Sequence, residues 1–335
     1  MATSAQLAHP HTEPWPQPQS PLTAMAPRLW GAKRGKAGIA LLGLAGLIFG
    51  GFPYWAARRI LYPVNPAMPA VIPDHLDTEI PGVEAEYAEF PTRDGGKLGG
   101  WFIPAPASAS EPAPCIMLVY GYGGFKEQMI YYAQIVHEAG FSSFMFDMQG
   151  SGLRRGKPVT LGYKEKWDLM DAINYVRTRP EVDGEHLGVL GVSMGAATAL
   201  LAAEDDPHIK SIVADSSYAN MVDMIKPGLR AFVGSPATIV APMIVWFAEN
   251  MMGVKASDIT PETSAHKLGR TPVFIIHGAN DQLTDPHSAQ RIYDALSGPK
   301  ELWVVANCGH ARAPEVEPEE YRRRVNEFFK RTLAA

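Results

Sequence analysis

The sequence predicts an α/β fold: a mostly parallel, doubly wound sheet preceded by one transmembrane helix. From residue 80 onward, short apolar runs alternate with helical stretches, which is typical of a parallel sheet with helices on both faces. Most of these runs are apolar throughout, as strands buried on both faces are. Upstream, residues 37–57 form an uncharged run that is long enough to cross a bilayer.

Length and composition limit the class of protein. A chain of 335 residues, 46% of them hydrophobic, has room for one large α/β domain or for two smaller ones. The net charge of −5 leaves no basic field for a nucleic-acid backbone, so that class is disfavoured. Cys115 and Cys308 cannot form a disulfide framework and have no zinc-site spacing. We interpret both as free thiols; a single bridge is the alternative in an oxidising compartment.

Residues 1–36 are predicted to be a disordered Pro-rich segment with a basic flank. The first 27 residues are rich in Pro, Gln, Ser and Thr, so they cannot bury enough apolar surface to offset chain entropy. Four cations then precede the apolar run: Arg28, Lys33, Arg34 and Lys36.

Residues 37–57 predict a membrane anchor. About 21 helical residues rise roughly 31 Å, the thickness of a hydrocarbon core. The preceding cations, with Tyr54 and Trp55 at the far end, place the amino terminus in the cytoplasm and the rest outside, periplasmic or lumenal. A cleaved signal peptide, giving a secreted protein, is the alternative because Trp55-Ala56-Ala57 resembles a cleavage site. The long apolar run and long leader favour a retained anchor.

The elements of the predicted sheet follow in chain order, in a domain spanning residues 79–335. VEAEYAEF and KLGGWFI flank Thr-Arg-Asp-Gly-Gly and predict a β-hairpin. The later strands are expected at CIMLVY, SSFMFD, LGVLGV, IKSIVADS, PVFIIHG and ELWVVAN. Helices are expected near residues 126–139, 164–178, 194–204, 286–297 and 316–332.

The stretch between Tyr218 and Arg270 interrupts this alternation. It is helical in character and rich in methionine, and we interpret it as an insertion covering one end of the sheet. Its apolar part is long enough for a second membrane span, but Pro236, Pro242 and Glu249 argue against that. The methionines predict either an adaptable apolar pocket or plain core packing.

Gly191-Val192-Ser193-Met194-Gly195 joins a predicted strand to a predicted helix. A Gly-x-Ser-x-Gly turn in this position holds its serine in a strained conformation that exposes the hydroxyl above the sheet edge. The pattern also arises by chance, so Ser193 is either a nucleophile or a small residue in a tight turn. The helix behind it would present its amino terminus to developing negative charge.

A serine nucleophile needs a base and an acid that orients the base. Asp281 stands just past one later predicted strand and His310 past the next, so both share the sheet edge of Ser193. The chain order Ser, Asp, His is the one that this motif requires. Asp285 is the nearest competitor for the acid, whereas His277 is expected to pack at its strand end.

Two backbone amides are expected to stabilise an oxyanion. One belongs to Met194, directly after the serine; the other comes from the glycine-rich loop after CIMLVY, where we choose Tyr122. A merely flexible loop is the alternative. GYGGFK lacks the spacing of a phosphate-binding loop.

With these residues the chain from about Glu79 to Leu333 resembles the α/β-hydrolase superfamily of serine hydrolases, particularly its prolyl-oligopeptidase-like and membrane-anchored esterase branches. The matching motifs are FDMQGSG, GVSMG, VADSSY, HGANDQLTD and NCGH. The resemblance implies an α/β-hydrolase fold with Ser193 as nucleophile, Asp281 as acid, His310 as base and residues 219–268 as a cap. Where many relatives have His-Gly after the third strand, this chain has Tyr120-Gly121.

The function expected from this pattern is cleavage of a carboxylic ester or thioester, with an apolar acyl group, through an acyl-enzyme. Such chemistry requires neither a metal nor an organic cofactor. The expected partners are a small-molecule or lipid-like ester and the membrane, with no nucleic acid. A serine peptidase of prolyl-oligopeptidase-like type, acyl transfer to another alcohol, and a non-catalytic binding protein of the same fold are the alternatives.

Overall fold

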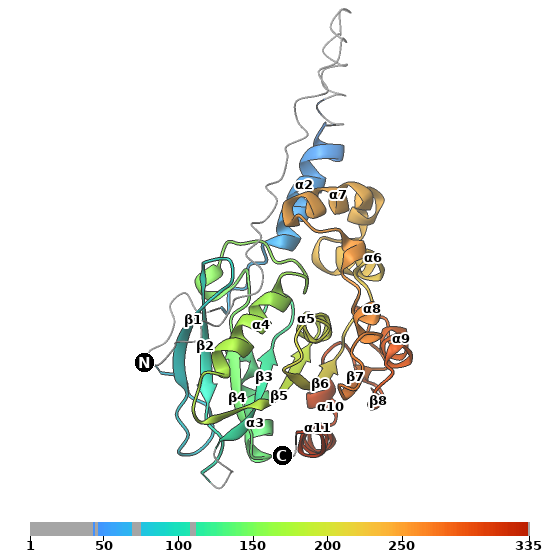
Figure 1. Cartoon of the computed structure of the whole chain (residues 1–335). Helices are drawn as coiled ribbons and strands as arrows, with labels where there is room; N and C mark the ends of the chain where they lie inside the picture. The colour runs from blue at the N-terminus through green and yellow to red at the C-terminus, as the bar shows by residue number, and fades with distance from the viewer. Residues whose placement is uncertain (1–42, 44–45, 69–74, 108–111, 334–335) are drawn as a thin grey trace, which may run out of the picture. The chain divides into compact units, whose positions relative to one another are not determined.

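The computed structural model describes residues 43, 46–68, 75–107 and 112–333. The chain divides into two compact units, residues 1–44 and 45–335, and all elements below belong to the second (Figure 1). The predicted disordered segment, residues 1–36, lies outside the described residues. The strands are β1 (Glu86–Pro91), β2 (Lys97–Ile103), β3 (Ala113–Val119), β4 (Ser142–Phe146), β5 (Val182–Val192), β6 (Ile209–Asp215), β7 (Val273–Gly278) and β8 (Lys300–Val305).

These strands form one sheet in the order β1-β2-β4-β3-β5-β6-β7-β8. β1, β2 and β4 pair antiparallel, and every pairing from β4 to β8 is parallel. The predicted hairpin leading into a mostly parallel sheet is therefore confirmed. The strand order reverses beside β3 and β5, which is where open α/β sheets form their sites.

Two helix layers cover the sheet. α3 and α11 pack together on one face, and α4, α5, α8 and α9 contact one another in series on the other (Figure 1). Phe274 of β7 meets Phe328 of α11 with ring centroids 5.6 Å apart. The bounds are η2 (Lys126–Met129), α3 (Ile130–Glu138), η3 (Gly152–Arg154), α4 (Glu165–Val176), α5 (Met194–Ala203), α8 (Pro261–Ala265), α9 (His287–Ala295), α10 (Ala313–Val316) and α11 (Pro318–Thr332).

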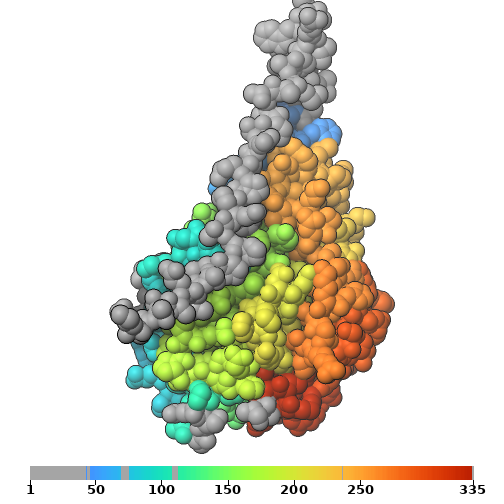
Figure 2. Space-filling view, in the orientation of Figure 1, coloured from blue at the N-terminus to red at the C-terminus, as the bar shows by residue number. Residues whose placement is uncertain are grey.

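The interrupting stretch folds into helices above the carboxyl ends of the strands, as a cap. It consists of α6 (Met221–Phe232), η4 (Ser235–Val240), α7 (Ala241–Met252) and η5 (Ala256–Asp258). α8, the last helix within the predicted cap of residues 219–268, contacts α5 and α9. In Figure 2 the cap lies, in yellow and orange, at the opposite end from the red C-terminal helix.

An earlier segment of the chain joins this cap. η1 (Leu47–Gly51) continues into α2 (Phe52–Leu61), which packs against α7 (Figure 1). Ala56 and Ala57 are fully buried there, in an apolar cluster with Leu229 and Ile244. Small side chains on α2 thus allow the two helices to approach closely.

The predicted membrane anchor, residues 37–57, falls partly outside the described residues. Among the residues that are described, no single helix is both long and apolar enough to cross a bilayer. One bent pair, Ala237–Met252 with Ala256–Ala265 at 68°, meets the requirement by length and composition. Cys115 and Cys308 are both buried and free.

Candidate active site

Ser193 occupies the sharp turn between β5 and α5. Its backbone has φ 55° and ψ −117°, a positive-φ conformation that is strained for any residue with a side chain. The flanking glycines make the turn possible, because a Cβ on Gly191 would lie 2.3 Å from the Gly195 carbonyl oxygen. A Cβ on Gly195 would lie 2.1 Å from the Val119 carbonyl oxygen. The turn therefore lifts the serine hydroxyl above the sheet edge.

The structure brings Ser193, His310 and Asp281 into one hydrogen-bonded chain. His310 Nε2 lies 2.8 Å from Ser193 Oγ, and His310 Nδ1 lies 2.7 Å from Asp281 Oδ2. Because an ionised carboxylate only accepts, His310 Nδ1 carries the proton and donates it to Asp281. Nε2 is then free to accept from the serine hydroxyl, which is the arrangement that general-base activation of a serine requires.

Asp281 is a buried carboxylate, and four N–H groups face its two oxygen atoms. Its Oδ1 accepts from the amides of Leu283 and Thr284, each at 2.9 Å. Its Oδ2 accepts from His310 and lies 3.3 Å from His277 Nε2. Burial alone would raise the pKa of Asp281, but the hydrogen bonds from His277 and His310 outweigh it and hold the pKa well below its usual range.

His277 is therefore more than a packing residue at its strand end. It is fully buried, and its Nε2 faces two acceptors, Asp281 Oδ2 and the Thr284 carbonyl at 3.1 Å. Two acceptors fix the proton on Nε2, while Nδ1 is buried without a partner among the described residues. The competitor Asp285 is exposed and accepts from His287 instead.

Two residues of the VADSSY motif, to which the sequence assigns no role in the site, tie the site together. The Asp215 carbonyl accepts from the Ser193 amide at 2.7 Å, and Ser216 Oγ accepts from the Ala311 amide at 3.1 Å, next to His310. Burial raises the pKa of Asp215 to about 6, although hydrogen bonds from Ser216 and Tyr321 oppose the shift. Their only sequence signal is the small polar group Asp-Ser-Ser at the end of an apolar strand.

The two residues whose amides are expected to hold an oxyanion, Met194 and Tyr122, line the same cavity as Ser193. Met194 is the first residue of α5, so its N–H has no partner within the helix. The loop carrying Tyr122 touches the nucleophile turn, since a Cβ on Gly121 would lie 3.3 Å from Ser193 Cβ. Glycine at position 121 thus allows the loop to approach the serine.

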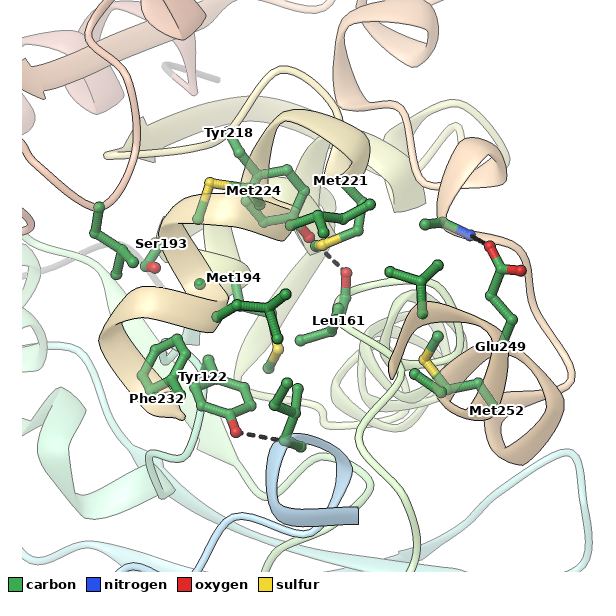
Figure 3. A pocket seen from close by; sticks show the side chains of 18 residues that line it. Tyr122, Leu161, Ser193, Met194, Tyr218, Met221, Met224, Phe232, Glu249 and Met252 are labelled. Carbon is green, nitrogen blue, oxygen red and sulfur yellow. Dashed lines mark hydrogen bonds between the residues drawn. The ribbon is translucent and has the colours of Figure 1, made fainter. Parts of the chain in front are cut away.

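A cavity with an enclosed volume of about 120 Å³ lies over Ser193 and under the cap. Figure 3 shows Met194, Met221, Met224 and Met252 arranged around it. The other described residues that line it are Ile60, Tyr122, Leu161, Tyr218, Ile225, Gly228, Leu229, Phe232, Val245, Ala248, Glu249, Ala256 and Leu283.

The polar side chains of this lining are already engaged with protein. Tyr122 Oη donates to the Ile60 carbonyl, and Tyr218 Oη donates to the Leu161 carbonyl (Figure 3). Glu249 Oε1 accepts from the Ala256 amide at 2.9 Å. Beyond Ser193, the cavity wall is therefore almost wholly hydrocarbon and thioether. Among the described residues, no group of three or more His, Cys, Asp or Glu side chains could hold a metal ion.

Two protein-family models match the chain. The model for X-Pro dipeptidyl-peptidase (S15 family) matches residues 101–236, and the model for the BAAT / acyl-CoA thioester hydrolase C terminal matches residues 169–314. Both matches include Ser193, and the second also includes Asp281 and His310.

Individual proteins match at modest identity. The uncharacterized protein YqkD of Bacillus subtilis (strain 168) is 28% identical over 200 residues, which cover 59% of this chain and 65% of YqkD, just under two thirds. The uncharacterized protein YfhR of Escherichia coli (strain K12) is 26% identical over 253 residues, covering 73% and 80%. The structure of the Pyrococcus furiosus esterase Pf2001 has a TM-score of 0.62 and 26% identity, covering 80% of this chain and all of that one.

Proposed function

The chain is a serine hydrolase of the α/β-hydrolase superfamily, and from this premise we propose that it cleaves a carboxylic ester or thioester with an apolar acyl group. The observation that carries the proposal is the pairing of a Ser193–His310–Asp281 chain with an apolar cavity directly above the serine. The thioester hydrolase model and the similarity to the Pyrococcus furiosus esterase support it.

The proposed reaction has two halves. Ser193 Oγ attacks the acyl carbon while its proton passes to His310 Nε2, and the Met194 and Tyr122 amides hydrogen-bond the oxyanion. The tetrahedral adduct collapses to an acyl-enzyme, and the alcohol or thiol leaves with the proton from His310. Water then loses a proton to His310 and attacks the acyl carbon. The bond between the acyl carbon and Ser193 Oγ breaks as His310 returns the proton to Oγ, which releases the acid and restores Ser193.

The cavity lining supports the apolar acyl group. Tyr122, Tyr218 and Glu249 are each engaged with backbone groups, so they offer few free partners to a polar substrate. An acyl chain that needs no hydrogen bonds fits such a wall, and methionine side chains adapt to its shape.

Covalent labelling and a substrate panel test the proposal together. Full-length protein is expected to react with a fluorescent fluorophosphonate and to hydrolyse p-nitrophenyl esters, with greater kcat/KM as the acyl chain lengthens. Folded protein that neither labels nor hydrolyses any ester or amide would contradict it and favour the non-catalytic alternative.

A serine peptidase remains the second candidate because of the S15 family match. Aminoacyl p-nitroanilides, run beside the esters, distinguish the two: higher kcat/KM on the anilides would favour the peptidase. Adding a primary alcohol to the ester assay and measuring the transesterified product tests acyl transfer.

Gly228 of α6 offers a way to shorten the cavity without straining the fold. Replacing it with leucine is expected to lower kcat/KM for p-nitrophenyl decanoate about tenfold or more, with little change for the acetate. The new side chain has room, because the nearest atom to a Cβ there is Phe232 Cδ2 at 4.0 Å. Lys226→Leu, exposed on the same helix, is the matched control. Equal losses on both esters would show that the acyl chain lies elsewhere.

We also propose that residues 37–57 anchor the protein in a membrane, with the hydrolase domain on the extracytoplasmic side. Exposed apolar side chains on η1 and α2, including Leu47, Phe49 and Trp55, support this, as does Trp246 on the adjoining α7. Retention in the membrane pellet after alkaline carbonate extraction tests the anchor, and protease accessibility in intact cells tests the orientation.

A further inference from the structure

The end of helix α2 is bonded to the loop that carries Tyr122. Tyr122 Oη donates to the Ile60 carbonyl at 2.6 Å, and Asn65 Nδ2 donates to the Gly123 carbonyl at 2.9 Å. A third bond, from the Val159 amide to the Leu61 carbonyl at 2.8 Å, holds the same segment to the hydrolase body. The segment of residues 60–65 thus lies between the cap and the oxyanion loop, residues 121–124.

These contacts restrict the loop at two consecutive residues. Tyr122 is held through its side chain and Gly123 through its carbonyl, and the Gly124 amide closes the turn onto the Gly121 carbonyl at 3.1 Å. Pro63 packs behind the turn, 3.5 Å from where a Cβ on Gly123 would lie. Burial raises the pKa of Tyr122 to about 12, so its hydroxyl keeps its proton at neutral pH.

Helix α2 is itself fixed to the cap. Its small residues Ala56 and Ala57 are fully buried, and Arg59 Nε donates to the Phe232 carbonyl at 3.2 Å. The Phe232 ring in turn lies 4.8 Å from the Tyr122 ring, measured between centroids (Figure 3). The helix, the cap and the oxyanion loop therefore meet at one point on the cavity wall.

We propose that α2 and residues 60–65 are a positioning element of the active site, which sets the Tyr122 amide for the oxyanion through the Tyr122 side chain and Asn65. This inference rests on the proposed function, because the amide's direction matters only where an oxyanion forms. It also bears on the signal-peptide alternative. Cleavage after Ala57 would remove the cap contacts of Ala56 and Ala57 but would leave Ile60 and Asn65, which bond the loop, in the chain.

Two single variants of the full-length protein test the inference. Tyr122→Phe keeps the ring and loses the bond to Ile60; Asn65→Ala loses the bond to Gly123. Each is expected to lower kcat for p-nitrophenyl butyrate about tenfold with KM nearly unchanged, because misplacing one donor weakens transition-state binding alone. The Ki of an aryl trifluoromethyl ketone, which forms a tetrahedral oxyanion on serine, should rise by the same factor.

The control is Asn250→Ala. Asn250 Nδ2 also donates to a backbone carbonyl, that of Trp246 at 2.7 Å, but it is exposed on α7 and does not line the cavity. Its kcat and inhibitor Ki are expected to stay within twofold of wild type, because the bond that it loses contacts neither the cavity nor the oxyanion loop.

Hydrogen exchange separates this inference from the proposed function. The amides of residues 121–124 are expected to exchange faster in both test variants than in wild type and Asn250→Ala. Wild-type exchange rates, or faster exchange with wild-type kcat, would overturn the positioning role. If wild type neither labels nor hydrolyses, the proposed function fails, and the exchange rates still decide whether the segment holds the loop.

Discussion

Replacing Ser193 with alanine is expected to lower kcat for p-nitrophenyl butyrate by about 10⁴- to 10⁶-fold and to abolish fluorophosphonate labelling. The substitution removes only the hydroxyl that lies 2.8 Å from His310 Nε2. Both predicted oxyanion donors are backbone amides, so a small residual rate above that in water should survive. Ser257→Ala, at an exposed position, is the control and should label like wild type.

A second substitution at this position separates catalysis from folding. Ser193→Gly is expected to be as inactive as Ser193→Ala but more stable than it, by about 1 kcal/mol or more. The reason is the φ of 55°, which costs alanine as much as serine but costs glycine little. Thermal unfolding of the two variants checks this. An alanine variant as stable as the glycine variant would show that the turn stores no strain.

The parallel sheet explains why the meeting of Ser193, Asp281 and His310 could be predicted from the sequence. Each residue follows the carboxyl end of an apolar run, and parallel neighbours bring such ends to one edge. The order β5-β6-β7-β8 then places the loops after β5, β7 and β8 along this edge, with the end of β6 between the first two. The hydrogen-bond distances from His310 to Ser193 Oγ, 2.8 Å, and to Asp281 Oδ2, 2.7 Å, depend on how the side chains pack. The pattern of apolar residues does not predict that packing.

The supporting contacts could not be predicted in the same way. His277 ends an apolar strand, as a packing residue would, and its bond with Asp281 depends on how the next loop turns back. The bond from the Ser193 amide goes to the backbone carbonyl of Asp215, so the Asp-Ser-Ser group does not reveal this contact. Such contacts depend on tertiary geometry. The positions of the strand ends, by contrast, can be predicted from the local pattern of apolar residues.

Helix α2 shows the limit of hydropathy as a signal. Residues 37–57 are apolar without a polar face, so lipid and a protein surface are equally suitable environments for them. In the described part, Ala56 and Ala57 contact protein while Trp55 is exposed. The buried face of α2 is the one that contacts α7, and α7 lies almost two hundred residues later in the chain. Hydropathy alone therefore does not distinguish the buried face of α2 from the exposed one.

The second large effect is expected for Asp281→Asn, which should lower kcat by about 10⁴-fold while the protein stays folded. The new amide oxygen can keep the two bonds from Leu283 and Thr284, which places the NH₂ group where Oδ2 was. That group is a donor, so His310 Nδ1 must become an acceptor and Nε2 must carry the proton. Ser193 then has no base, although all three residues remain in place.

The pH dependence of the free energy of unfolding gives the Asp281→Asn prediction a further check. The pKa of Asp281 is held below the ordinary value of about 4, so its charge stabilises the native state above that pH and the contribution is lost on acidification. The acid-induced loss of stability below about pH 4 should therefore be smaller in Asp281→Asn than in wild type. Unfolding free energies measured from pH 3 to 7 check the difference.

Asp285→Asn is the matched control, because Asp285 pairs with His287 on the surface and does not reach His310. It should keep wild-type kcat, whereas Asp281→Asn should not. An Asp281→Asn variant that kept more than a tenth of the activity would mean that another carboxylate orients His310. Asp215, buried at the end of β6, is the group to replace next, and its loss in the Asp281→Asn background should then abolish the remainder.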